Sequence, residues 1–199
     1  MAKAQPLIVA AIDFGTTYSG WTFSFRHDFE KDPTKVEAKI WRGGQLSSLK
    51  GPTCILIQTD GETLEAIGFE AEKKYCDLAE SEEDKDWFYF HRFKMDLWDE
   101  DDELVELHES TELEDVRGRT LPALTVFSLF LGSLKEDAMS TFYQRIAADF
   151  LDDEEIHWII TIPAIWIDAA KSFMRRAAEK VFFSIKDDNL STILHFANS

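Results

Sequence analysis

A short segment near the N-terminus, Ile12 to Ser19, combines residue types that bind anions. Gly15 follows an apolar run, and a glycine turn after a buried strand lets backbone N–H groups converge on an anion. Thr16 and Thr17 add hydroxyl donors. Because Asp13 would repel a phosphate directly, we expect a hydrated Mg²⁺ between them, since Mg²⁺ keeps several waters and takes few protein ligands. An ordinary β-turn, with Asp13 bonded to its own backbone, explains the octapeptide equally well.

Other chemistries find less support in the sequence. The five histidines show no metal-ligand spacing with one another or with the two cysteines. Neither a P-loop (Gly-x-x-x-x-Gly-Lys-Ser/Thr) nor a nucleophile elbow (Gly-x-Ser-x-Gly) occurs. Two cysteines are too few for a disulfide framework, which favours reduced thiols in the cytosol.

The elements that would position the octapeptide follow from the spacing of apolar residues. Residues 7–12 form a continuous apolar run, typical of a strand buried on both faces. Residues 21–25 alternate between apolar and polar, as in a half-buried strand. Together they predict a β-hairpin whose turn carries the two threonine hydroxyls. We expect further strands at 36–41, 54–59 and 63–67, and a helix at 70–80.

The second half of the chain predicts a helix, a strand, a helix and a last strand. Apolar residues recur at helical spacing from Leu124 to Phe142, with Thr120 as the expected N-cap and Pro122 in the first turn. We expect the remaining elements in this order: a strand at 156–162, a helix capped by Asp168, and a strand at 191–196.

Composition and charge exclude several classes of protein. The chain has 199 residues, of which 45% are hydrophobic and 13% aromatic, enough for a globular core without disulfides or metal. Its formal net charge of −17 argues against nucleic acid and anionic membrane surfaces as partners. Residues 96–115 are dense in Asp and Glu and contain no Lys or Arg, which favours a solvated loop.

Three spaced segments carry a family resemblance. Residues 13–19, Asp-Phe-Gly-Thr-Thr-Tyr-Ser, resemble the phosphate-binding hairpin of the actin-like ATPase superfamily, particularly the 70-kDa heat-shock proteins. Residues 158–166, Trp-Ile-Ile-Thr-Ile-Pro-Ala-Ile-Trp, resemble that family's second core strand and proline switch, and residues 171–178 resemble the helix after it. The second tryptophan and the segment 93–95 look most like the divergent member-12 branch (12A/12B type). The resemblance implies an α/β fold, a ribonuclease-H-like core of the actin-like ATPase type with an inserted smaller α+β subdomain.

The resemblance also implies roles for individual residues of the octapeptide. Gly15, Thr16, Thr17 and Tyr18 would lie against the β- and γ-phosphates of ATP. Asp13 would hold Mg²⁺ through water. ATP and Mg²⁺ are therefore the expected cofactors.

Three residues outside the octapeptide receive roles by the same resemblance. The family has a lysine from the smaller subdomain that reaches the γ-phosphate and the attacking water, and Lys94 is the best match for this catalytic role. Arg92 competes with it, because the alignment slips easily by two residues among the neighbouring aromatics. A cation lying on an aromatic surface would explain either residue without any function. Pro163 matches the proline that relays the nucleotide state, although a simple strand terminator would also be a proline.

The chain departs from the family at its C-terminal end. In the family, the strand matching residues 191–195 continues into a Glu-Pro-x-Ala-Ala segment whose glutamate assists hydrolysis, whereas residues 195–199 here read His-Phe-Ala-Asn-Ser. The second lobe and the substrate-binding domain have no counterpart. Because phosphoryl transfer depends on positioning around the phosphates, half of a cleft is not expected to turn over ATP alone. Whether the chain is an enzyme stays open.

The expected organisation is a core subdomain at 1–40 plus 116–199, with a smaller subdomain inserted at 41–115. The expected function is that of a cytoplasmic, ATP- or ADP-binding, chaperone-related protein of the stress response. Its partners would be protein clients or co-chaperones. The alternatives are a non-catalytic interaction module, a truncated paralogue that binds protein through the old cleft face and the acidic loop, and a fragment of a longer ATPase. Self-association through the exposed cleft face is a further expectation.

Overall fold

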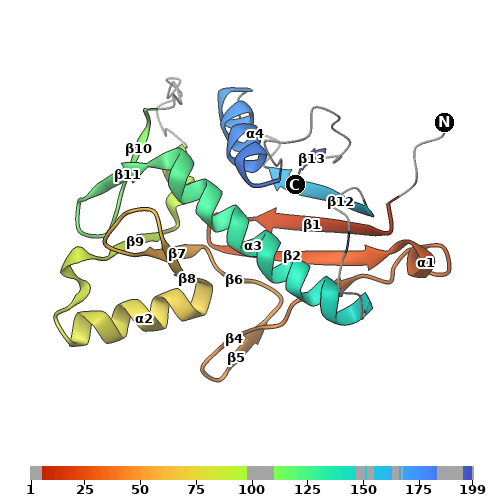
Figure 1. The fold of residues 1–199 in the computed structure, drawn as a ribbon, viewed down its shortest axis with the longest axis horizontal. Coiled ribbons are helices and arrows are strands. Elements are labelled where there is room, and N and C mark those ends of the chain that lie inside the picture. Colours follow the sequence, from red (N-terminus) through yellow and green to blue (C-terminus); the bar gives the residue numbers. More distant parts are fainter. Residues whose placement is uncertain are drawn as a thin grey trace.

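The computed structural model describes residues 6–97, 110–146, 151, 155–162, 166, 168–182 and 195–198. A mixed β-sheet carries two long helices, and a smaller group of strands with one helix lies beside it (Figure 1). Parallel and antiparallel strands thus combine with helices, as the predicted α/β class requires.

The main sheet is built around the N-terminal hairpin. Its strands are β1 (Ile8–Phe14), β2 (Tyr18–Phe25), β3 (Glu37–Ala38), β6 (Gly51–Pro52), β12 (Ile156–Ile162) and β13 (His195–Asn198). The order is β13–β12–β1–β2–β3, and β6 also pairs with β2. β1 is antiparallel to β2 and parallel to β12, which is parallel to β13. An antiparallel meander followed by parallel strands that are reached through helices is the ribonuclease-H-like arrangement, which confirms the predicted fold class.

Strand β1 is buried on one face only. Ile8, Ile12 and Phe14 are fully buried, whereas Val9, on the opposite face, is 38% exposed. The prediction of a strand buried on both faces is therefore wrong at Val9, because the long helices pack on the other face of the sheet.

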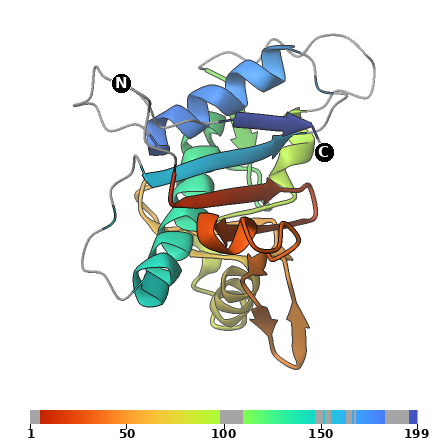
Figure 2. The same cartoon turned by 90° about the vertical axis from the view of Figure 1, so that its right-hand side faces the viewer.

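Helices α3 (Ala123–Ile146) and α4 (Asp168–Phe182) lie side by side on the buried face (Figures 1 and 2). The ring of Phe127 in α3 contacts Phe14 of β1 and Phe173 of α4, each at a centroid distance of 5.3 Å. Trp158 of β12 contacts Phe182 of α4 at 5.1 Å. Aromatic side chains thus pack the two helices against β1, which leads into the octapeptide, and against the neighbouring strand β12.

The predicted start of α3 is wrong. Residues Thr120–Pro122 form strand β11, which pairs with β10 (Glu112–Glu114), so the helix begins only at Ala123. A short hairpin upstream of the helix takes the residues expected to form its cap and first turn. The predicted apolar stripe from Leu124 to Phe142 does form the buried side of the helix.

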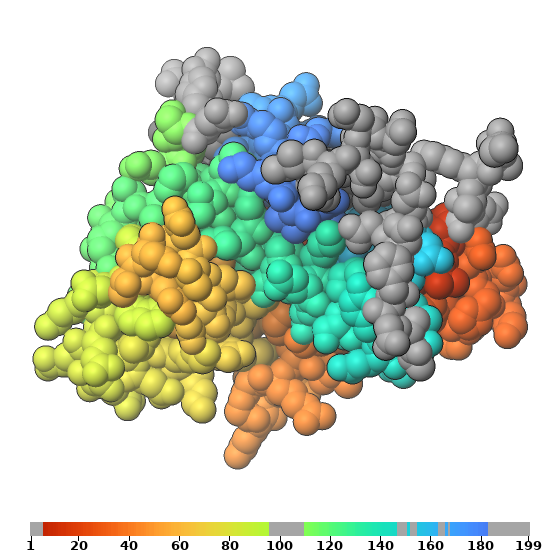
Figure 3. Space-filling model, viewed as in Figure 1, coloured from red at the N-terminus to blue at the C-terminus, as the bar shows by residue number. Residues whose placement is uncertain are grey.

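The smaller group is an antiparallel sheet of order β8–β7–β9 packed against helix α2. Its elements are β7 (Cys54–Ile57), β8 (Leu64–Ile67), α2 (Gly68–Glu80), the 3₁₀ turn η1 (Asp84–Asp86), β9 (Phe88–His91) and the 3₁₀ turn η2 (Phe93–Leu97). Ile55 and Ile57 of β7 belong to the main core, so the two groups share one hydrophobic interior. The hairpin of β4 (Trp41–Gly43) and β5 (Leu46–Ser48) projects at the bottom of the molecule in Figure 3.

The remaining differences from the sequence prediction are local. The strand expected at 36–41 is divided between β3 and β4, and the short helix α1 (Arg26–Phe29) was not predicted. The last strand is observed at His195–Asn198, and residues 191–194 lie outside the described residues. Most of the acidic stretch, residues 98–109, also lies outside them.

The subdomain boundaries stay a prediction. β6 falls in the segment assigned to the inserted subdomain and pairs with β2 of the main sheet, and the hairpin β10–β11 crosses the boundary at residue 116. Cys54 is buried and Cys76 exposed, and both are free thiols. Across the described helices, no stretch combines the length and the hydropathy that crossing a bilayer would require.

Candidate functional site

The octapeptide lies where the carboxyl ends of two parallel strands meet. Asp13 of β1 and Thr161 of β12 are register partners, and the Thr161 hydroxyl donates a hydrogen bond to Asp13 Oδ1 at 2.8 Å. Ligands of open α/β sheets bind at the carboxyl ends of the strands. The topology therefore places the predicted hairpin at the edge of the sheet where a ligand is expected.

The hairpin turn is held closed by buried hydroxyl groups. Gly15 N–H donates to Ser19 Oγ at 3.2 Å, and Thr53 Oγ1 donates to the Gly15 carbonyl oxygen at 2.8 Å. The two hydroxyl oxygens, of Ser19 and Thr53, are 2.7 Å apart, and both side chains are buried. A Cβ atom at Gly15 would lie 2.2 Å from the carbonyl oxygen of Tyr18, so only glycine fits there.

The side chains predicted to face phosphate lie on the outside of this turn. Thr16 is half-buried, while Thr17 and Tyr18 are exposed. The Thr17 carbonyl oxygen accepts a hydrogen bond from Thr53 N–H at 2.9 Å, which ties the tip of the turn to the strand β7 region. Hydrogen bonds thus hold the backbone of the turn, while the side chains of Thr17 and Tyr18 stay accessible to a ligand.

Lys94, in η2, is buried beside the same turn. Its side chain is held by a hydrogen bond that Nζ donates to the carbonyl oxygen of Phe14, and the residue is only 5% exposed. Nζ also lies 4.8 Å from the ring centroid of Trp166 and 5.2 Å from that of Phe14. Burial lowers the pKa of Lys94 to about 8, with Asp13 opposing the shift and Lys50 adding to it.

Lys94 and its competitor Arg92 have different surroundings. Arg92 is exposed, and its backbone has a positive φ of 53°, which turns the chain between β9 and η2. The neighbouring Phe93 is fully buried against Phe14, Phe127 and Phe130, at centroid distances of 5.1 to 5.9 Å. This anchor directs Lys94 toward the turn, so the geometry favours Lys94, while its catalytic role stays a prediction.

Asp13 is paired in this structure with a residue that the sequence analysis did not select. Lys50, in the loop before β6, donates to Asp13 Oδ2, while Thr161 bonds Oδ1. Burial raises the pKa of Asp13, but the hydrogen bonds from Lys50 and Thr161 outweigh it, so the pKa is lowered overall. Both carboxylate oxygens are therefore already engaged.

This arrangement does not fit the predicted Mg²⁺. The predicted ion would need the Asp13 carboxylate. The ammonium group of Lys50 already pairs with that carboxylate and takes the place of the positive charge that the ion would bring. The protein itself supplies the cation at Asp13.

Several site residues escaped the sequence analysis for identifiable reasons. Thr161 lies in the motif that resembles the second core strand, and the pairing of two parallel strands would have pointed to it. Thr53 and Lys50 reach the turn only through the pairing of β6 with β2, for which the sequence carries no signal. Ser19 belongs to the octapeptide itself and bonds Gly15 within the hairpin. Pro163, the predicted switch residue, lies outside the described residues.

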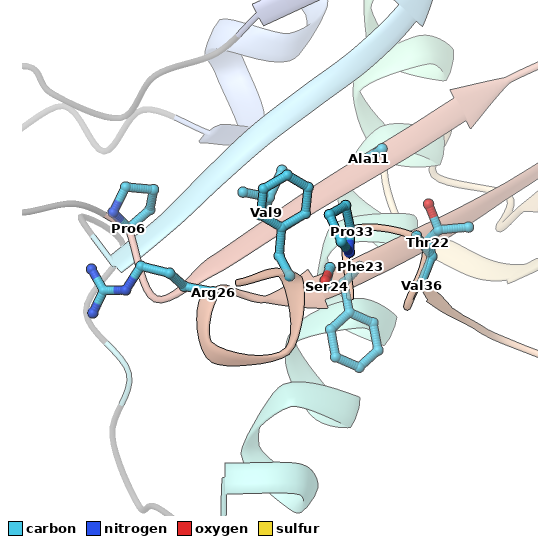
Figure 4. A pocket seen from close by; sticks show the side chains of 10 residues that line it. Pro6, Val9, Ala11, Thr22, Phe23, Ser24, Arg26, Pro33 and Val36 are labelled. Atoms are coloured by element: carbon cyan, nitrogen blue, oxygen red, sulfur yellow. The ribbon is translucent and has the colours of Figure 1, made fainter. Parts of the chain in front are cut away.

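A separate apolar hollow of about 450 Å³ lies on the face of the main sheet that the long helices leave open. Val9 and Ala11 of β1 and Thr22 and Ser24 of β2 contribute to its lining, as Figure 4 shows. It contains none of the predicted site residues. Its lining suits apolar contact rather than chemistry.

Comparison with known proteins gives relatives for most of the chain. No family model matches. Human heat shock 70 kDa protein 12B is 38% identical over 179 residues, which is 88% of this chain and 24% of that protein. Mouse and human heat shock 70 kDa protein 12A are 38% and 37% identical over 175 residues, 86% of this chain and 24% of each protein.

A distant likeness to a solved structure was also found. MreB5 of Spiroplasma citri, in a crystal structure bound to ADP, superposes with a TM-score of 0.43 at 10% identity, over 96% of this chain and 38% of that one. The family assignment rests on the sequence relatives, heat shock 70 kDa proteins 12A and 12B. The chain is a homologue of the member-12 branch of the heat-shock 70-kDa proteins, and it spans about a quarter of the length of the relatives it matches.

Proposed function

We propose that this chain binds the phosphate groups of an adenine nucleotide, ATP or ADP, at the turn formed by residues 15–18. The proposal treats the chain as one wall of a nucleotide cleft of the heat-shock 70-kDa type. Because phosphoryl transfer needs groups on all sides of the phosphates, the chain is proposed to bind nucleotide without turning it over alone.

The observation that carries this proposal is the position of Lys94. Within the described part of the chain this ammonium group has no ion-pair partner, and its one hydrogen bond goes to a backbone carbonyl beside the turn. A buried charge that forms no ion pair costs stability, and Asp13 offsets this cost only in part, so the retention of this charge favours a role in binding an anion. Phosphate is the anion that a glycine turn with flanking hydroxyl groups accommodates.

Thermal unfolding with and without ATP tests the proposal. At a nucleotide concentration one hundred times Kd, linkage predicts about 2.7 kcal/mol of stabilisation. For a chain of this size that corresponds to a rise in Tm of roughly 5–10 °C. The loss variant is Lys94→Met, which keeps an unbranched side chain one atom shorter and removes the charge.

Arg92→Met is the matched control, because it removes a charge two residues away on an exposed side chain. We expect the shift in Tm to persist in Arg92→Met and to disappear in Lys94→Met. A wild-type chain whose Tm does not respond to saturating nucleotide would contradict the proposal. Equal effects of the two substitutions would contradict the assignment of Lys94.

The role in the cell is proposed at a coarser level. The relatives are named as heat shock proteins, and a chaperone-related role in the cytoplasm, with protein clients or co-chaperones, is the extension of that homology to this chain. A pull-down with and without nucleotide would test it, because partners of such a protein should change with the nucleotide state.

A second candidate function is protein interaction without nucleotide. The apolar hollow beside β1 favours it, since Phe29 and Val36 on its rim are 54% and 57% exposed. Sedimentation at increasing protein concentration tests self-association, and Val36→Asp is the disrupting variant. A chain that stays monomeric and binds no nucleotide would contradict both candidates.

A further inference from the structure

Lys50 is positioned by the fold rather than by chance contact. The pairing of β6 with β2 sets Gly51 opposite Ser19 and Pro52 opposite Tyr18. A Cβ atom at Gly20 would lie 2.9 Å from the Leu49 carbonyl oxygen and 3.3 Å from Lys50 Cγ, so glycine at this position lets the loop approach β2 closely. Lys50 is thereby brought to the end of β1, where it pairs with Asp13.

Three charges converge at the turn of residues 15–18. Asp13 contributes one negative charge, and Lys50 and Lys94 each contribute a positive charge when protonated. The local balance is therefore positive in a chain whose net charge is −17. A phosphate group would meet attraction at this turn even without a metal ion.

Lys50 already offsets the repulsion between Asp13 and a phosphate that a metal ion would otherwise have to remove. A carboxylate next to a phosphate repels it, and a cation between them removes that repulsion. An ammonium group has three donor hydrogens, so Lys50 can keep its bond to Asp13 and donate to a phosphate oxygen at the same time. The side chains of Lys50 and Asp13 are 45% and 42% exposed, which leaves both open to a ligand.

We propose that Lys50 replaces Mg²⁺ at Asp13, so that this chain binds the phosphates of a nucleotide in metal-free form. The inference rests on the proposed function and adds one property of the same site: nucleotide binding there does not depend on divalent cations. Lys50 bound to Asp13 competes with a metal ion for the same carboxylate.

Titration calorimetry with ATP, in Mg²⁺ and in EDTA, tests the inference on the full chain. Wild type should bind with similar affinity in both conditions. Lys50→Gln should lose about tenfold in affinity in EDTA, the equivalent of one charge-assisted hydrogen bond. It should recover in Mg²⁺, because the freed carboxylate can then hold the hydrated ion. Lys50→Arg, which keeps the charge with a different donor geometry, should lose less affinity in EDTA than Lys50→Gln.

A matched control is Lys35→Gln, which removes the same charge from an exposed lysine paired with Asp28, away from the turn. It should change neither affinity. An exposed ion pair contributes little to stability, so both variants are expected to fold, which their Tm values without ligand verify.

A second readout does not need nucleotide. Mg²⁺ alone should raise the Tm of Lys50→Gln and leave that of wild type unchanged. The inference is overturned if Mg²⁺ stabilises both proteins equally, or if wild type binds ATP only with Mg²⁺; the proposed function stands in the latter case. If no protein binds ATP in either condition, the proposed function fails and this inference falls with it.

Discussion

The ammonium group of Lys94 donates a hydrogen bond to the backbone carbonyl of Phe14, a residue that precedes it by 80 positions. The contact joins the smaller group of strands to the end of β1. Trp166, which follows the second core strand, lies over the same ammonium group. Two segments that carry the family resemblance, residues 13–19 and 158–166, thus meet at the buried cation of residues 93–95.

Nucleotide affinity should fall as the pH rises through about 8, the pKa to which burial lowers Lys94. Only the protonated ammonium attracts phosphate, and Asp13 and Lys50 are the charged neighbours of Lys94. Titration calorimetry on either side of the pKa measures the change. An affinity that does not change across this range would contradict a direct role of Lys94, and Lys94→Met should abolish the dependence.

The burial of the Lys94 ammonium group also predicts that the free energy of unfolding rises with pH. Its pKa is lower in the folded chain, about 8, than the ordinary value of 10.5, so between these values the unfolded chain binds more protons. The free energy of unfolding contributed by Lys94 therefore increases as the pH rises from about 8 toward 10.5. Denaturant unfolding at several pH values measures it. The difference between wild type and Lys94→Met should shrink over this range, and a constant difference would contradict the buried charge.

Gly15→Ala should disrupt the turn. The new Cβ atom would lie 2.2 Å from the carbonyl oxygen of Tyr18, a backbone atom that cannot move without breaking the hairpin. We expect a loss of about 1–3 kcal/mol in unfolding free energy, the range for overpacking, together with loss of nucleotide binding. Gly132→Ala is the control: it lies within α3 with its nearest contact at 3.8 Å and should stabilise the chain by about 0.5–1 kcal/mol. Similar behaviour of the two variants would refute the steric argument.

Thr53→Val should destabilise the chain by about 1–3 kcal/mol, because it leaves the Gly15 carbonyl oxygen without the donor that Thr53 Oγ1 provides. Ser19→Ala should have an effect of similar size, since its hydroxyl bonds both Gly15 and Thr53. The double variant should lose less than the sum, because the two hydroxyls belong to one network. Chemical denaturation of all four proteins completes the cycle, and strict additivity would show that the hydroxyls act independently.

Phe93→Ala should cost about 3–5 kcal/mol, because the ring is fully buried among the rings of Phe14, Phe127 and Phe130. Tyr143→Ala, on a side chain that is 37% exposed, should stay within about 0.5 kcal/mol of wild type. Thermal unfolding compares the stabilities of the two variants.

Phe93→Leu, a milder change, should remain folded and weaken nucleotide binding, since Phe93 anchors the turn that carries Lys94. Unchanged binding in this folded variant would contradict that coupling.

The sequence by itself determined the class of fold and the location of the turn. Continuous apolar runs and their alternation identified β1, β2 and β12, because side-chain burial in strands follows the period of the pleat. Helical spacing identified the buried side of α3, although not its first residue, since the pairing of β11 with β10 is a contact between segments rather than a property of either one. The glycine and hydroxyl residues of the turn were visible because their chemistry is local.

Only the tertiary structure decided which charges meet at that turn. In the sequence Arg92 competes with Lys94, the better match, and the burial of Phe93 between them exposes Arg92 and encloses Lys94. Lys50 carries no signal in the sequence, yet the pairing of β6 with β2 sets it against Asp13 and changes the expected role of that carboxylate. Local patterns fix elements through short-range sterics and burial, whereas the electrostatics of a site depends on distances that only the packing of distant segments establishes.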